Sequence, residues 1–252
     1  MINEKILLGF PVDFKDICQI YPPTVNDICG DNDFLICQTL FTMTQEELED
    51  AYDKEGIEQI PTPFQYLMIN CYQDENMKEK VIKGLYKLIR EPVAIVPEIE
   101  MFLIGKYEDD IDPDIDLDEP RLITADNYFD FQNQIRLVMG EKEVEPPEVP
   151  DPNEDPRITR WKRKVREHDK IVKKKKAKDG PKFGTLLAAI CCMGIGITPL
   201  NIGEISYACV HWLIEMEQQK EEYDINIRSL LAGADSKKIK PKYWIKNLDE
   251  NL

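Results

Sequence analysis

Four aspartates at every second position give the chain its clearest metal-like pattern: Asp112, Asp114, Asp116 and Asp118. Alternating carboxylates of this kind occur in calcium loops, but an EF-hand also needs Gly at the sixth loop position and Glu at the twelfth. Counted from the first aspartate, those positions hold Leu117 and Ile123. The pattern therefore fails as an EF-hand, and a solvated acidic hairpin or loop is the better interpretation.

The cysteines offer a second metal hypothesis, because Cys191, Cys192, Cys209 and His211 are the one group of zinc-type ligands in the sequence. Structural zinc sites use paired ligands that can face one metal ion. Cys209 and His211 are two residues apart in a predicted helix, so their side chains point in different directions. We interpret the seven cysteines as free thiols, mostly in apolar surroundings, of a protein in a reducing compartment. We expect no metal ion and no cofactor.

Catalytic motifs are also missing from the sequence. The two histidines, His168 and His211, have no nucleophile motif around them. No G-x-S-x-G, P-loop, G-x-G-x-x-G or H-E-x-x-H pattern occurs, and these are the short motifs that carry a defined mechanism. We therefore expect a protein that is not an enzyme, although a site made only of carboxylates could be hidden among the 48 acidic residues.

A strongly basic segment at 157–182 holds 13 Lys and Arg residues. Its candidate contact residues are Arg160, Lys162, Arg163, Lys173, Lys174, Lys175 and Lys176. Such a cluster can grip nucleic acid or another anionic surface, but the net charge of the whole chain is −16 and repels phosphate. We favour a solvated face or an interaction arm, which could pair with the acidic run at 108–119, over nucleic-acid binding.

The organisation of the chain follows from its breaks. The 252 residues suit one or two domains. Residues 141–182 form a proline-rich acidic segment followed by the basic arm, which predicts a mixed helical domain over 1–140, a linker over 141–182 and a helical C-terminal region over 183–252 that could pack onto the first domain. The N-terminus has no secretion signal, and no apolar run reaches the roughly 20 residues of a membrane span.

The element that positions the C-terminal candidates is a long predicted helix over 200–234. Asn201 and Glu204 predict a capping box at its start, and Gly233 predicts its end. An apolar stripe follows the helical period. Its members are Ile205, Cys209, Trp212, Met216, Tyr223, Ile227 and Leu230. Such a stripe must be covered, either by the rest of the chain or by a partner.

The remaining elements give the fold class. Capping signals at Thr24, Thr44 and Thr62 each predict the start of a helix, and a further helix is predicted to start at Thr124 or Asp126. Residues 5–14 predict a strand, a turn near Gly9 and a returning strand, and β-branched residues in 93–104 predict further strands. We expect an α+β fold that is mainly α, a helical bundle with a small hairpin or sheet around residues 93–123.

Several stretches resemble a group of bacteriophage proteins from the tail-morphogenesis region of phages of Gram-positive bacteria. They are Ile20-Tyr21-Pro22-Pro23-Thr24-Val25-Asn26-Asp27-Ile28, Asp130-Phe131-Gln132-Asn133-Gln134-Ile135-Arg136, His211-Trp212, Glu222-Tyr223-Asp224, Ala232-Gly233-Ala234-Asp235 and Trp244. The likeness spans most of the chain, and its motifs are structural rather than chemical. One departure is size, because the best-known tail assembly chaperones are often shorter.

The resemblance implies a non-enzymatic protein similar to tail assembly chaperones, which cover the hydrophobic tape-measure protein until the tail tube forms. The partner would be the tape-measure protein or another tail protein, with a homo-oligomer possible, without nucleic acid or membrane, in the host cytoplasm or in the virion. The candidate partner-binding residues are Tyr66, Trp212, Met216, Tyr223, Ile227 and Trp244. These faces could instead close the protein's own core. The alternatives are a virion component, such as a tail or baseplate adaptor, and a nucleic-acid-binding regulator that uses the basic arm.

Overall fold

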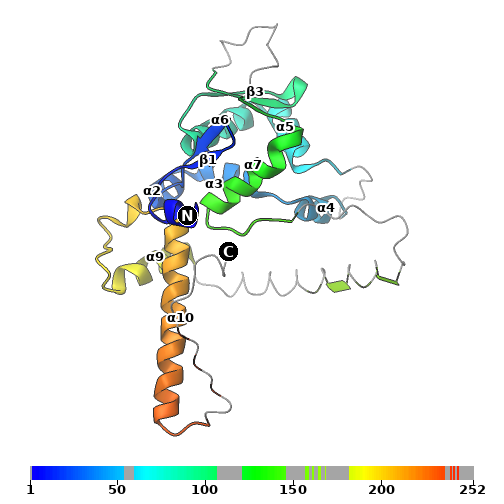
Figure 1. Ribbon diagram of the computed structural model, residues 1–252. Helices are drawn as coiled ribbons and strands as arrows, with labels where there is room; N and C mark the ends of the chain where they lie inside the picture. The colour runs from blue at the N-terminus through cyan, green and yellow to red at the C-terminus, as the bar shows by residue number, and fades with distance from the viewer. Residues whose placement is uncertain are drawn as a thin grey trace.

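The computed structural model describes residues 2–53, 60–106, 121–145 and 182–235, with the single positions 157, 158, 161, 164, 165, 168, 239, 241 and 243. Within them the fold is α+β and mainly α, as the sequence predicts. The helices form a body from which one long helix extends (Figure 1). The acidic run and most of the basic arm lie outside the described residues.

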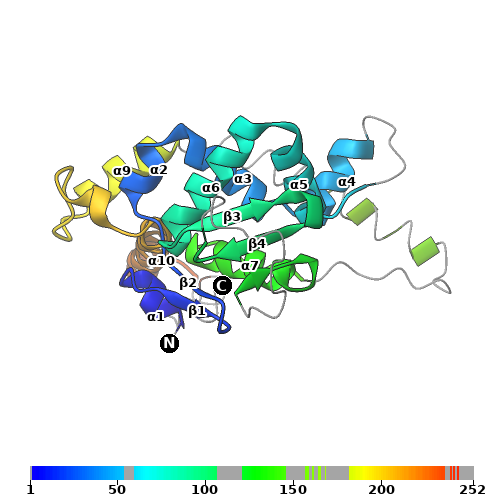
Figure 2. The ribbon, with the colours of Figure 1, turned by 90° about the horizontal axis from the view of Figure 1, so that it is seen from above.

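The helices of the N-terminal part follow the chain breaks closely. They are α1 (Ile2–Leu7), α2 (Val25–Cys29), α3 (Asn32–Thr42), α4 (Gln45–Asp53), α5 (Pro63–Gln73), α6 (Glu75–Ile89) and α7 (Ala125–Val138). The C-terminal part contributes α9 (Phe183–Cys192) and α10 (Tyr207–Leu231), with a short 3-10 turn at Ile202–Glu204 between them. Figure 2 shows α10 nearly end-on beside the body.

The capping signals predicted at the threonines are confirmed. Thr62 accepts a hydrogen bond from the backbone N–H of Gln65, whose side chain accepts one from the Thr62 N–H. The same reciprocal arrangement starts α2 at Thr24 and α4 at Thr44. Because these boxes satisfy backbone donors that have no partner inside the helix, local sequence sets where these helices begin.

Two small antiparallel sheets complete the body. The predicted strands near residue 93 form a three-stranded sheet of β3 (Val93–Val96), β4 (Met101–Ile104) and β5 (Leu122–Ile123), in the order β3-β4-β5. This sheet lies over one end of the helical body (Figures 1 and 2). The second sheet is a hairpin of β1 (Val12–Phe14) and β2 (Cys18–Ile20), in which Val12 pairs with Ile20.

The predicted strand before Gly9 is wrong. Residues 2–7 form helix α1, and the hairpin lies further on, with its turn between Phe14 and Cys18. A short apolar run does not distinguish a strand from a helix by its period. Here Gly9, at φ 76°, ends the helix, and Ile6 is buried in the core.

The main core draws on α1 to α3, α5 to α7, both sheets and the start of α10. Phe64 contacts the Phe102 ring edge-on at 5.5 Å between centroids and the Tyr128 ring at 4.6 Å, which joins α5, β4 and α7. The Tyr128 ring is buried, and burial raises the pKa of its hydroxyl. The core also includes Ala208 and Trp212 of α10. The start of this helix, from its cap Ser206 to Ile214, which we call its root, therefore shares a core with the N-terminal elements.

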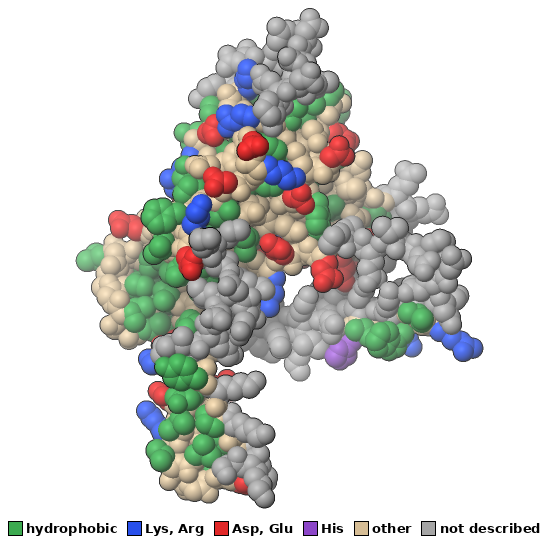
Figure 3. Space-filling model, viewed as in Figure 1, with side chains coloured by type: hydrophobic (Ala, Val, Ile, Leu, Met, Phe, Trp, Pro, Cys, Tyr) green, Lys and Arg blue, Asp and Glu red, His purple; other side chains and the backbone are tan. Residues whose placement is uncertain are grey.

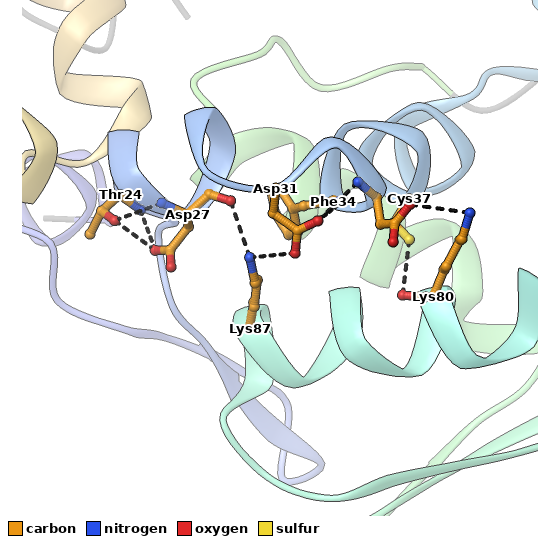
Figure 4. A network of polar contacts seen from close by, with 8 residues as sticks. Thr24, Asp27, Asp31, Phe34, Cys37, Lys80 and Lys87 are labelled. Carbon is orange, nitrogen blue, oxygen red and sulfur yellow. Dashed lines mark hydrogen bonds and ion pairs between the residues drawn. The ribbon is translucent and has the colours of Figure 1, made fainter. Parts of the chain in front are cut away.

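A polar network ties α2 and α3 to α6 (Figure 4). The Lys87 ammonium donates to the Asp27 carbonyl at 3.2 Å and lies 2.9 Å from an Asp31 carboxylate oxygen. Asp31 is also the N-cap of α3, and its hydrogen bond with Lys87 lowers the pKa of that carboxyl. Cys37 donates its thiol hydrogen to the Lys80 carbonyl at 3.0 Å. The network fixes the position of these three helices relative to one another.

The predicted start of the long helix needs a correction. The capping residue is Ser206 rather than Asn201, because Ile202–Glu204 forms a 3-10 turn and Ile205 is extended. The Asn201 side chain instead accepts the backbone N–H of Thr198 at 2.7 Å. Ser206 was missed because its hydroxyl serves a tertiary contact as well as the cap. The predicted end at Gly233, at φ 94°, is confirmed.

We predict that Ser206→Ala lowers the free energy of unfolding by about 1–2 kcal/mol, because it removes a helix cap and leaves a carbonyl without its donor. Urea denaturation measures the change. Ser229→Ala, in the same helix but with no cap to lose, is the matched control and should change stability little. Equal effects of the two substitutions would contradict the role given to Ser206.

Candidate partner-binding surface

The root of α10 is held by backbone and side-chain contacts with the start of the chain. The Ser206 hydroxyl accepts the Cys209 backbone N–H at 3.2 Å and donates to the Ile6 carbonyl at 3.2 Å. The Val25 N–H donates to the Ile205 carbonyl, and the Tyr207 N–H donates to the Pro23 carbonyl. These bonds join residues about 180 to 200 positions apart and fix the direction in which α10 leaves the body.

Close packing at Gly140 supports the same root. A Cβ atom at Gly140 would lie 2.9 Å from the Cα of Ala208, and the residue has φ 74°. Only glycine satisfies both the left-handed backbone and the close approach. The end of α7 therefore packs directly against the first turn of α10.

Helix α9 lies along one side of α10 and forms a second hydrophobic cluster with it. Its buried members are Val25, Ile190, Ile202 and Val210. The Phe183 ring lies 5.2 Å from Tyr207 and 6.5 Å from His211 between ring centroids. This half-buried aromatic site lowers the pKa of His211 through desolvation, so the neutral imidazole is favoured.

The C-terminal two-thirds of α10 extends away from the body, and we name Met216–Leu231 the arm. Among the described residues, neither hydrophobic cluster of the body includes a residue of α10 beyond Ile214. The extension is visible in Figure 1, where the helix continues well past the last element of the body. Sixteen residues of helix span about 24 Å.

An apolar stripe runs along the arm in continuation of the buried residues at the root. Met216, Tyr223 and Ile227 lie on one face and are half-buried, because residues seven and eleven apart return to nearly the same side of a helix. Ile225 lies on the opposite face, two and a half turns from Met216, and is 61% exposed. Figure 3 shows hydrophobic side chains gathered at the root of α10 and on the arm.

Tyr243 also lies against the arm. Its ring contacts the Tyr223 ring edge-on, with the centroids 5.8 Å apart. The structure therefore places Tyr243 on the arm. Helix α10 ends at Leu231, and Tyr243, twenty positions after Tyr223 in the sequence, lies back beside the helix.

The predicted partner-binding residues fall into three groups. Trp212 is 6% exposed and belongs to the main core, so it supports the arm rather than forming a free surface. Tyr66 is half-buried, packs against the same core and meets Tyr52 edge-on at 6.4 Å. Met216, Tyr223 and Ile227 lie together on the arm. Trp244 lies outside the described residues, as do Arg160, Lys162, Arg163, Lys173, Lys174, Lys175 and Lys176.

The cysteines are placed mainly for packing. Cys18, Cys37, Cys71 and Cys209 are buried, and burial raises the pKa of the first three thiols to about 12. Within the described residues no three His, Cys, Asp or Glu side chains converge as metal ligands. No helix of the described part is long and apolar enough to cross a membrane.

One comparison with known proteins gives a match. Residues 173–249 match the family model described as the YomV second domain. No curated protein and no solved structure matches the chain. The matched segment contains α9 and α10, including the arm. It begins inside the predicted linker at 141–182. The division into 1–140, 141–182 and 183–252 stays a prediction.

We predict that acidification weakens the packing of α9 on α10. The folded-state pKa of His211 lies below its ordinary value of 6.5, so the unfolded chain binds the proton more tightly. The stabilisation is complete above pH 6.5 and is lost as the pH falls toward the folded-state pKa. The control is His211→Phe, which keeps an aromatic ring. Chemical denaturation from pH 7.5 to 5 should show the wild type losing stability relative to this variant, and parallel curves would contradict the prediction.

Proposed function

We propose that this protein is a non-catalytic phage protein that binds the tape-measure protein during tail assembly and keeps it soluble. The observation that carries the proposal is the apolar stripe of α10, which continues from the core onto the arm. Because the body holds the root of α10 and the arm extends away from the body, the stripe on the arm is presented to a partner. Helix-to-helix docking through residues at this spacing is a common mode of recognition.

The likeness of residues 173–249 to the YomV second domain supports phage origin, because YomV is a protein of Bacillus phage type. The resemblance of the chain's motifs to tail-morphogenesis proteins supports the narrower role. A tape-measure protein is a long helical chain with exposed apolar surface before assembly. A protein that covers it needs an adaptable apolar face, and methionine with tyrosine on the arm supplies one.

The experiment is co-expression of the full chain with the tape-measure protein of the same genome, followed by a pull-down. We predict that the tape-measure protein remains soluble and is recovered with the wild type, and that Met216→Glu reduces its recovery about tenfold or more, because burying a carboxylate in an apolar contact is costly.

Ile225→Glu is the matched control, since it adds the same charge on the opposite face of the same helix. It should leave recovery unchanged. If the tape-measure protein aggregates in the presence of the wild type, the chaperone function is wrong. If both variants bind equally well, the arm is not the docking site.

A virion component is the alternative that the same experiments address. A helix that extends from a body could also join two parts of a finished tail. Mass spectrometry of purified particles separates the two roles, because a chaperone leaves before maturation and a tail or baseplate adaptor remains in stoichiometric amount.

A further inference from the structure

The charges beside the apolar stripe of the arm follow a regular arrangement. Glu215 and Glu222 are seven residues apart and lie along one edge of the stripe, whereas Glu217 and Asp224 lie along the other edge. Arm residues 216–231 hold four carboxylates against two cations. One of these cations, Lys220, already contacts the Glu217 carboxylate at 3.3 Å. Both cations lie on the Glu217–Asp224 side, where Glu221 also lies, so carboxylates outnumber cations along each edge of the stripe.

The side-chain oxygen of Gln219, in the same region, is buried without a hydrogen-bond donor among the described residues. The Gln219 side chain uses its amide nitrogen to donate to Glu215 at 3.2 Å. Its carbonyl oxygen is shielded from water and has no donor among the described residues. A shielded acceptor without a donor costs free energy, commonly about 1–3 kcal/mol. A partner that brings an N–H group to this point would remove that cost.

Tyr243 lies against the Tyr223 end of the stripe. It contacts Tyr223 edge-on, yet 61% of its own surface remains exposed. A ring that leaves most of its surface in water contributes little burial energy. An incoming side chain that covered the Tyr223 ring would bury more apolar surface there than this edge-on contact does.

We propose that the arm binds a basic amphipathic helix, whose apolar face covers Met216, Tyr223 and Ile227 and whose Lys or Arg side chains pair with the carboxylates on both edges. In the free protein Tyr243 occupies the Tyr223 end of this surface, and the incoming helix displaces it. The inference rests on the arm as the docking site of the proposed function and adds the charge of the partner and an internal competitor.

Charge complementarity decides between the two simplest occupants. A second copy of the arm would bring carboxylates against carboxylates along both edges, because the arm itself supplies few cations. A basic helix instead meets opposite charge on each edge while its apolar face meets the stripe. Complementary charge of this kind sets orientation and speeds association.

The test uses the full-length protein and a synthetic amphipathic helix of leucine and lysine labelled for fluorescence anisotropy. A matched peptide carries glutamate in place of lysine. We predict that the lysine peptide binds and the glutamate peptide does not. Tyr223→Ala should weaken binding of the lysine peptide by about tenfold, as expected for a buried aromatic contact. Tyr86→Ala, an exposed tyrosine on α6, is the control with the same change of side chain and no change of charge.

A separate variant tests the role of Tyr243 as a competitor. Tyr243→Ala should tighten binding of the lysine peptide several-fold, because it removes a contact that must break before the helix docks. Weaker binding would show that Tyr243 forms part of the docking surface, and unchanged binding would show that it takes no part. Either result overturns its role as competitor. Equal binding by Tyr223→Ala and wild type would show diffuse attraction to an acidic protein, which overturns the docking proposal.

These outcomes are separable from those of the proposed function. If the lysine peptide binds in the predicted pattern but the tape-measure protein is not recovered, the chemistry of the arm stands and the identity of its partner is wrong. If the tape-measure protein is recovered but the lysine peptide does not bind through the arm, the charge and competition proposals are wrong and the chaperone function stands. A self-associating arm would show as dimerisation in sedimentation analysis, lost in Met216→Glu, and would overturn the basic-helix proposal.

Discussion

The attachment of the α10 root to the start of the chain is the constraint on which the rest of the structure depends. Ser206 holds the carbonyl of Ile6, and the backbone of Tyr207 holds that of Pro23. Because Gly140 allows the end of α7 to approach Ala208 directly, the first turn of α10 has contacts on several sides. A helix held in this way keeps its direction after it leaves the body, so its far half can present a surface without a core of its own.

Local signals were sufficient for most of the fold. The threonine caps at Thr24, Thr44 and Thr62 and the helix-ending Gly233 act through neighbouring residues, and the structure confirms each of them. Ser206 and α1 were missed for a common reason. Contacts with distant parts of the chain determine the roles of the Ser206 hydroxyl and the Ile6 side chain. A sequence pattern over a few turns does not contain those contacts.

The candidate surface was predictable only in part. The helical spacing of Met216, Tyr223 and Ile227 is visible in the sequence, and so is its continuity with Trp212. Where the core ends along that stripe is not, because it depends on the length of the elements that pack against the root. The structure assigns Trp212 to the core and the following residues to the arm, and it places Tyr243 beside the arm.

The contacts at the α10 root have a consequence for the covalent chain between 145 and 182. The described residues up to 145 and those of 182–235 are joined by backbone hydrogen bonds, a shared core and the packing of Gly140 on Ala208. None of these contacts uses the segment between them. Two separately translated fragments would therefore meet through the same interface, and a cut in that segment would leave a two-piece complex. The covalent link raises the local concentration of the two parts, and the contacts among the described residues define how these parts fit together.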